Sequence, residues 1–113
     1  MSLVGLEIQE LRYSERGIQL KFRVPDSVLY FEGHFPGFPI LPGIVQIDWA
    51  IALARSYLAP HVGPVHTIQV KFRKAIRPNS VVAASLSLAA DGRRLDVVYR
   101  DNKGPYVTAR IGF

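Results

Sequence analysis

The sequence predicts an α+β domain in which a curved antiparallel sheet of five to six strands wraps around one long buried helix. Three observations support this fold class. Apolar and polar residues alternate in several short segments, a pattern typical of half-buried strands. A mostly apolar stretch at residues 40–54 has the length of a helix. The chain has 113 residues, which suits one core, so we expect residues 1–113 to form a single domain.

Two strands are expected before the helix. Residues 1–12 mix apolar residues with acids and predict a short first strand. Residues 17–24, GIQLKFRV, alternate strictly between apolar and polar side chains and predict a half-buried second strand. Residues 25–42 contain four prolines and several aromatic residues. We therefore expect a stiff irregular loop there, packed against the protein.

The apolar stretch after this loop predicts a helix from Gly43 to about Leu58. Pro42 favours a helix start, because proline is suited to the first turn. Pro60 and Gly63 favour an end. Apolar residues would lie on nearly every side of this helix, so we expect it to be buried.

Only strand patterns follow the helix. We expect strands at residues 65–76, 81–90, 95–100 and 106–113, with turns at residues 78–80, 91–92 and 101–105. The Asp-Gly pair in the second turn is a strong hairpin signal. Because the turns are short, we expect these four strands to form an antiparallel meander in chain order.

Composition restricts the classes of function. The chain has no cysteine, which excludes disulfides and thiolate chemistry and fits a cytoplasmic protein. Fourteen basic residues against nine acids give a net charge of +5, which fits an acidic partner. Nucleic acid is not expected, since no DNA-binding motif or aromatic stacking platform is visible. Neither a membrane span nor a signal peptide is expected, because no apolar stretch has the required length and flanks.

The segment GHFPGFPILPGIVQID, residues 33–48, combines three candidate functional residues. His34 lies in a rigid frame of proline and glycine, and neutral imidazole suits a general base near neutral pH. The alternative is a packed loop histidine. Asp48 is the only acid of the apolar stretch, and burial favours the protonated carboxyl that a general acid needs. The alternative is a helix acid that reaches solvent and is favoured by the helix dipole.

Gly43 is the third candidate, because it stands where the predicted helix begins. A helix N terminus offers unpaired N–H groups, and glycine permits a ligand to approach the backbone closely. A carbonyl oxygen of a substrate would fit there. The alternative is a glycine that only starts the helix.

The segment from Gly33 to Asp48, with HFPG at residues 34–37 and the Pro42-Gly43 pair, resembles the active-site segment of hotdog-fold 3-hydroxyacyl-[acyl carrier protein] dehydratases. Residues 70–80, VKFRKAIRPNS, resemble the strand that follows the central helix in that family. In length the chain resembles a short branch of these dehydratases from aryl-polyene and related lipid clusters. It departs from the family at Asp48, where the large non-isomerising branch has glutamate, and at residues 79–80, where a Gly-Asp turn is usual.

The resemblance implies a hotdog fold and the dehydration of 3-hydroxyacyl-[acyl carrier protein] to the trans-2-enoyl product in fatty acid or related lipid synthesis. His34 would be the base at C2, Asp48 the acid at the C3 hydroxyl, and Gly43 the residue that holds the thioester carbonyl. No cofactor is implied, since the substrate is carried on the phosphopantetheine arm of acyl carrier protein. A homodimer is also implied, in which each site takes His34 from one chain and Asp48 from the other. A higher assembly, or a hetero-dimer with another hotdog protein, stays open.

Several further residues have candidate roles. Possible tunnel or interface residues, with core packing as the alternative for each, are Phe35, Phe38 and Trp49. Possible contacts to an acidic carrier protein, with a solvated strand face as the alternative, are Lys71, Arg73, Lys74 and Arg77. His61 and His66 have no further ligands nearby in the sequence, so no metal site is expected.

Two other functions stay open at this point. A hotdog acyl thioesterase would activate water rather than aim a base at C2. A non-catalytic subunit would instead shape a partner dehydratase.

Overall fold

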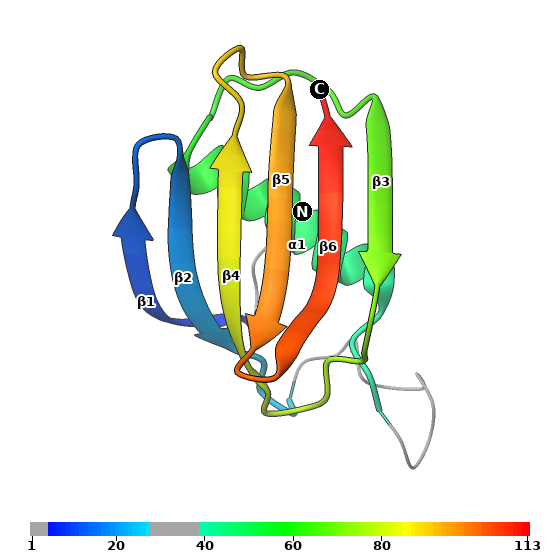
Figure 1. Ribbon diagram of the computed structural model, residues 1–113. Coiled ribbons are helices and arrows are strands. Elements are labelled where there is room, and N and C mark those ends of the chain that lie inside the picture. The colour runs from blue at the N-terminus through cyan, green and yellow to red at the C-terminus, as the bar shows by residue number, and fades with distance from the viewer. Residues whose placement is uncertain (1–4, 28–38) are drawn as a thin grey trace.

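The computed structural model describes residues 5–27 and 39–113, which form a six-stranded sheet with one helix across one of its faces (Figure 1). The elements are β1 (Glu7–Tyr13), β2 (Gly17–Arg23), α1 (Gly43–Tyr57), β3 (Thr67–Phe72), β4 (Val81–Leu88), β5 (Arg94–Asp101) and β6 (Gly104–Gly112). Each strand pairs antiparallel with its neighbours. The predicted α+β class, with up to six strands and one long helix, is confirmed.

The order of strands across the sheet is β1-β2-β4-β5-β6-β3. The predicted chain-order meander is therefore wrong for its first strand, because β3 pairs with β6 and not with β4. The connection after β3 runs along the end of the sheet. Near its start, the Arg73 N–H donates to the Tyr106 carbonyl at 2.8 Å, and near its end, the Asn79 N–H donates to the Val24 carbonyl at 2.7 Å. Turn residues alone cannot show that a connection spans the sheet in this way.

The core lies between the sheet and the inner side of α1. Trp49 of the helix and Phe22 of β2 meet edge to face, with ring centroids 6.1 Å apart. Phe22 also meets Tyr99 of β5 edge to face, at 5.5 Å. All three side chains are fully buried. In the single chain Trp49 is thus a core residue, in line with the packing alternative considered for it, and its role at a tunnel or interface stays a prediction.

The outer side of α1 is not covered by the rest of the described chain. Ile44 is 66% exposed, and Asp48, Ile51 and Ala52 are half-buried. The expectation of a helix buried on nearly every side is therefore wrong for this side, although most of its residues are apolar. Within residues 5–27 and 39–113, no helix is both long and apolar enough to cross a membrane.

Replacing Phe22 by alanine is expected to lower the free energy of unfolding by about 3–5 kcal/mol, because a large buried ring is lost from the contact between helix and sheet. Tyr13, an aromatic residue of the neighbouring strand that is 65% exposed, provides the matched control. Tyr13→Ala should change the free energy of unfolding by about 0.5 kcal/mol or less. Urea denaturation followed by circular dichroism measures both, and equally small effects would contradict the central place of Phe22.

Candidate active site

No described side chain caps the N terminus of α1. Pro42 occupies the N-cap position with φ −59° and ψ 142°, and it makes no side-chain hydrogen bond to the helix. The N–H groups of Val45 and Gln46 both donate to the Pro42 carbonyl, at 3.1 and 3.2 Å. Helix geometry leaves the N–H groups of Gly43 and Ile44 without an acceptor inside the helix. Together with the helix dipole, they suit a negatively charged or carbonyl oxygen.

Gly43 lies directly against Phe72, the last residue of β3. A β-carbon placed on Gly43 would lie 2.5 Å from Cζ and 2.9 Å from Cε1 of the Phe72 ring. Phe72 is 49% exposed, so it borders both the helix N terminus and solvent. Glycine is therefore needed here at least for the packing of Phe72. The sequence reasoning did not single out Phe72, although it lies in the VKFR segment that resembles the family.

Gln46 holds the chain just before the helix. Its side chain is 3% exposed, and its Nε2 donates to the Leu41 carbonyl at 3.0 Å. The Leu41 N–H in turn donates to the Ile76 carbonyl at 2.8 Å. The Gln46 main-chain carbonyl accepts a hydrogen bond from the Tyr99 hydroxyl at 3.0 Å. The sequence reasoning missed this residue, and the available signal was an amide within an otherwise apolar stretch.

Asp48 lies four residues after Ile44, on the outer side of α1. Helical spacing places Ile44, Ile51 and Ala52 around it, so the half-buried carboxyl group stands among apolar side chains. Within the described residues it forms no hydrogen bond or ion pair. A carboxyl group without a partner among the described residues is available to a ligand or to another chain. Its role as an acid stays a prediction.

The three remaining aromatic and imidazole candidates of the loop, His34, Phe35 and Phe38, lie outside the described residues. Their predicted roles stay predictions.

The four basic candidates differ in their surroundings. Arg73 and Arg77 are exposed in the connection after β3. Lys74 is half-buried, lies 2.6 Å from an Asp101 carboxylate oxygen, and has its ammonium group 4.7 Å from the centre of the Tyr106 ring. Its hydrogen bond holds the pKa of Asp101 down at about 2. The expectation of an exposed lysine is thus wrong at this position, because Lys74 is engaged within the fold.

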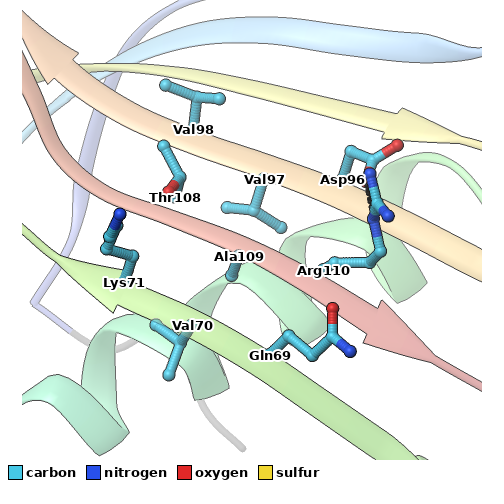
Figure 2. A pocket seen from close by; sticks show the side chains of 9 residues that line it. All are labelled: Gln69, Val70, Lys71, Asp96, Val97, Val98, Thr108, Ala109 and Arg110. Atoms are coloured by element: carbon cyan, nitrogen blue, oxygen red, sulfur yellow. Dashed lines mark hydrogen bonds and ion pairs between the residues drawn. The ribbon is translucent and has the colours of Figure 1, made fainter.

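Lys71 is exposed on the face of the sheet that points away from α1. Lys71 lies opposite Thr108 of β6. The preceding residue, Val70, lies opposite Ala109, which is buried on the helix side, so the Lys71 side chain points to the other face. Figure 2 shows Lys71 at a shallow hollow of about 380 Å³ over β5, β6 and β3. On the other side of the hollow, an Asp96 carboxylate oxygen lies 3.2 Å from Arg110. The hollow and the helix N terminus therefore lie on opposite faces of the sheet.

His61 and His66 are both exposed and border a hollow of about 550 Å³ beyond the C terminus of α1. Its lining includes the residues that directly follow α1, at the opposite end of the helix from Gly43. In the described part of the chain, no group of three or more histidine, cysteine or acidic side chains could hold a metal ion.

Both the sequence and the fold are similar to those of known proteins. A family model described as ApeI-like, ApeI dehydratase, matches residues 9–110. The chain belongs to this dehydratase family. Among curated relatives, the 3-hydroxyacyl-[acyl-carrier-protein] dehydratase FabZ of Protochlamydia amoebophila is 31% identical over 94 residues, which cover 74% of this chain and 60% of that protein. FabZ of Levilactobacillus brevis is 30% identical over 79 residues, covering 61% and 51%. The chain spans half to three fifths of the length of these relatives.

Solved structures share the same architecture. The dehydratase heterocomplex ApeI:P from Xenorhabdus doucetiae matches with a TM-score of 0.82 and 23% identity, over 93% of this chain and 94% of that chain. A mutant thioesterase, PA1618 from Pseudomonas aeruginosa, matches with a TM-score of 0.64 and 19% identity, over 96% and 79%. At this identity the likeness shows a common fold. The predicted hotdog fold and the resemblance to its dehydratases are confirmed.

The contact between Gly43 and Phe72 can be tested with a double-mutant cycle. Gly43→Ala is expected to lower the free energy of unfolding, because the added methyl group must displace the Phe72 ring. In the Phe72→Ala background, the same change should be neutral or stabilising by up to about 1 kcal/mol, since alanine favours a helix more than glycine does. Urea denaturation of the four proteins gives the coupling energy.

Gly63 provides the control for this cycle, because a β-carbon there meets no described atom within 4 Å. Gly63→Ala should have the same effect with and without the Phe72 ring. A coupling energy of zero between Gly43 and Phe72 would show that the ring does not rest against the glycine.

Proposed function

We propose that this chain dehydrates 3-hydroxyacyl-[acyl carrier protein] to trans-2-enoyl-[acyl carrier protein]. The observation that carries the proposal is the position of Asp48. In a chain of the dehydratase family, this carboxyl group without a described partner lies little more than one helical turn from the helix N terminus, which no described side chain caps. An acid and a carbonyl-binding group are thereby held on one short, rigid segment.

In the proposed reaction, neutral His34 removes the proton from C2 of the substrate. Negative charge develops on the thioester oxygen, where the N–H groups at Gly43 would stabilise it. Protonated Asp48, directly or through a water, gives its proton to the C3 hydroxyl, and the C3–O bond breaks as water leaves. The double bond forms between C2 and C3, and no electrons are exchanged with an outside oxidant or reductant.

Arg73 and Arg77 would attract the acidic carrier protein, since complementary charge speeds association. Lys71 would add to this attraction only at longer range, from the face of the sheet that points away from α1. All three are exposed in or just after β3, the strand that ends at Phe72 beside the helix N terminus. Lys74 would contribute mainly by holding this connection to Asp101.

A homodimer would use the free edge of β3. The sheet has two edges, and β1 carries a register shift between Ile8 and Glu10, an irregularity that hinders pairing with another strand. β3 pairs with β6 without such a shift. Its apolar residues on the helix side are exposed in the single chain: Ile68 at 44%, Val70 at 40% and Phe72 at 49%. A second copy would cover them.

The sequence of β3 favours one register for this pairing. Antiparallel pairing about Val70 would place Ile68 opposite Phe72 of the partner subunit and Gln69 opposite Lys71 of the partner subunit. Pairing about Lys71 would instead place two lysines directly opposite each other, which is unfavourable. A shift by a single residue would put the two helices on opposite faces of the joined sheet. In the proposed dimer, His34 of one chain acts together with Asp48 of the other.

A second candidate function is that of one subunit in a pair of different hotdog proteins. The similar Xenorhabdus doucetiae structure is a dehydratase heterocomplex, which favours this alternative. In that arrangement the edge of β3 would receive a related chain instead of a second copy. A thioesterase shares the fold, but the family match favours a dehydratase.

The reaction is tested with purified protein and 3-hydroxyacyl-[acyl carrier protein] of several chain lengths, by following the absorbance of the enoyl thioester. We expect turnover by the wild type. His34→Ala and Asp48→Asn should each lower kcat by about 10²–10⁴-fold, because a general base or acid is lost. Asp48→Glu should retain part of the activity, since glutamate is the common residue of the related branch.

His61→Ala and Asp91→Asn serve as controls, because both residues are exposed beyond the other end of the helix. Near-normal rates for both site variants would contradict the site assignment. Turnover only after addition of a second hotdog protein would support the partner-subunit function instead. Release of free acid without enoyl product would indicate a thioesterase.

The dimer is tested with Val70→Lys, which places a charge at the centre of the proposed strand pairing. Light scattering after size-exclusion chromatography should give a dimer for the wild type and a monomer for this variant. Val81→Lys is the matched control, because Val81 is a valine of similar exposure, 44%, on interior strand β4. A dimer that persists in Val70→Lys would contradict pairing through β3.

A further inference from the structure

Gln46 is a buried polar residue that the proposed reaction does not use. Its Oε1 has no hydrogen-bond partner among the described residues, although the side chain is 3% exposed. A buried unpaired acceptor is unfavourable for folding, and an apolar side chain of similar length would avoid it. Buried groups of this kind often have a functional explanation. The oxygen of the amide therefore adds no stability, and what the side chain contributes is the hydrogen bond from its Nε2.

The hydrogen bond from the Gln46 side chain restrains the orientation of the Leu41–Pro42 peptide. Helical side chains point toward the N terminus of their helix, and Gln46 reaches back past Pro42 to the Leu41 carbonyl. The Leu41–Pro42 peptide has no N–H group, because residue 42 is proline. Its carbonyl is therefore the hydrogen-bonding group through which its plane can be fixed. The amide of Gln46 supplies that restraint from within the helix.

The plane of this peptide determines where the helix N terminus points. The proline ring restricts φ of Pro42, which is −59°, and the bonds from the Val45 and Gln46 N–H groups to the Pro42 carbonyl restrain its ψ of 142°. The directions of the following N–H groups therefore depend on how the preceding peptide is oriented. On the other side of Leu41, its N–H is bonded to the Ile76 carbonyl. The segment before Gly43 is thus restrained from the helix and from the connection after β3.

We propose that Gln46 is a positioning residue that aims the N–H groups of Gly43 and Ile44 at the thioester carbonyl by fixing the Leu41–Pro42 peptide. This inference rests on the proposed dehydratase function. The helix itself does not need the amide, because Trp49 anchors it in the core and the Tyr99 hydroxyl bonds to the main chain of residue 46, whatever its side chain.

The first test is Gln46→Met, which keeps the length of the side chain but removes the amide. The variant should fold with a melting temperature close to that of the wild type, because it removes the unpaired Oε1 but leaves the Leu41 carbonyl without its donor. Its kcat should fall by about tenfold or more, with KM within about twofold of the wild type, because the donors lose their alignment in the transition state. Tyr99→Phe is the control: it removes the other buried hydrogen bond to Gln46, so the melting temperature should fall while kcat stays within about twofold. A folded Gln46→Met with wild-type kcat would overturn the inference.

The second test is Gln46→Glu, which decides the question if Gln46→Met does not fold. Only a protonated carboxyl group can donate to the Leu41 carbonyl. The ratio of its kcat to that of the wild type should therefore fall as the pH rises from about 5 to about 9, the range in which a buried glutamic acid ionises. A ratio independent of pH would overturn the inference.

A third measurement does not depend on turnover. In ¹H–¹⁵N spectra, the amide resonances of Gly43 and Ile44 should shift in Gln46→Met, while those of Arg55 and Ser56 at the other end of the helix stay in place. If the wild type has no dehydratase activity, the proposed function fails, and these shifts still test the role of Gln46. Unshifted resonances of Gly43 and Ile44 would overturn it.

Discussion

The position of α1 on the sheet depends on the buried contact between Tyr99 and the first turns of the helix. The Tyr99 hydroxyl donates to the Gln46 main-chain carbonyl at 3.0 Å, and its ring packs against Phe22, which also meets Trp49. Burial raises the pKa of Tyr99, so the hydroxyl keeps its proton and stays a donor. This contact lies near the N terminus of the helix and holds that part of the helix against the sheet.

The two sides of the helix meet different requirements. The inner side is packed into the core and gives the segment its rigidity. The outer side presents Ile44 and Asp48, and the nearby edge strand presents Val70 and Phe72. An apolar surface with one carboxyl group in it is suited both to contact with another chain and to chemistry shielded from water. In the proposed dimer, assembly and catalysis therefore use the same surface.

Local patterns in the sequence were sufficient for most elements but not for their arrangement. The helix begins at Gly43 as expected from Pro42, and the Asp91-Gly92 turn joins β4 to β5. The partner of β3 could not be predicted, because alternation identifies a strand but not its neighbour. Of the candidate site, the sequence identified Asp48 and Gly43 by their residue type and place. Phe72 and Gln46 could not be assigned to the site from the sequence, because their contacts depend on how distant segments pack.

The place of β3 in the sheet also has a consequence for folding. Among the described strands its only neighbour is β6, which is synthesised after β4 and β5. β2, β4 and β5 can pair with one another before β6 is made, whereas β3 cannot pair until then. Closing the long loop between β3 and β6 also carries an entropic cost. Phe72 reaches its position beside Gly43 through the same pairing. A nascent chain can thus hold its helix in place before Phe72 lies beside Gly43, and the pairing of β3 with β6 completes that part of the candidate site.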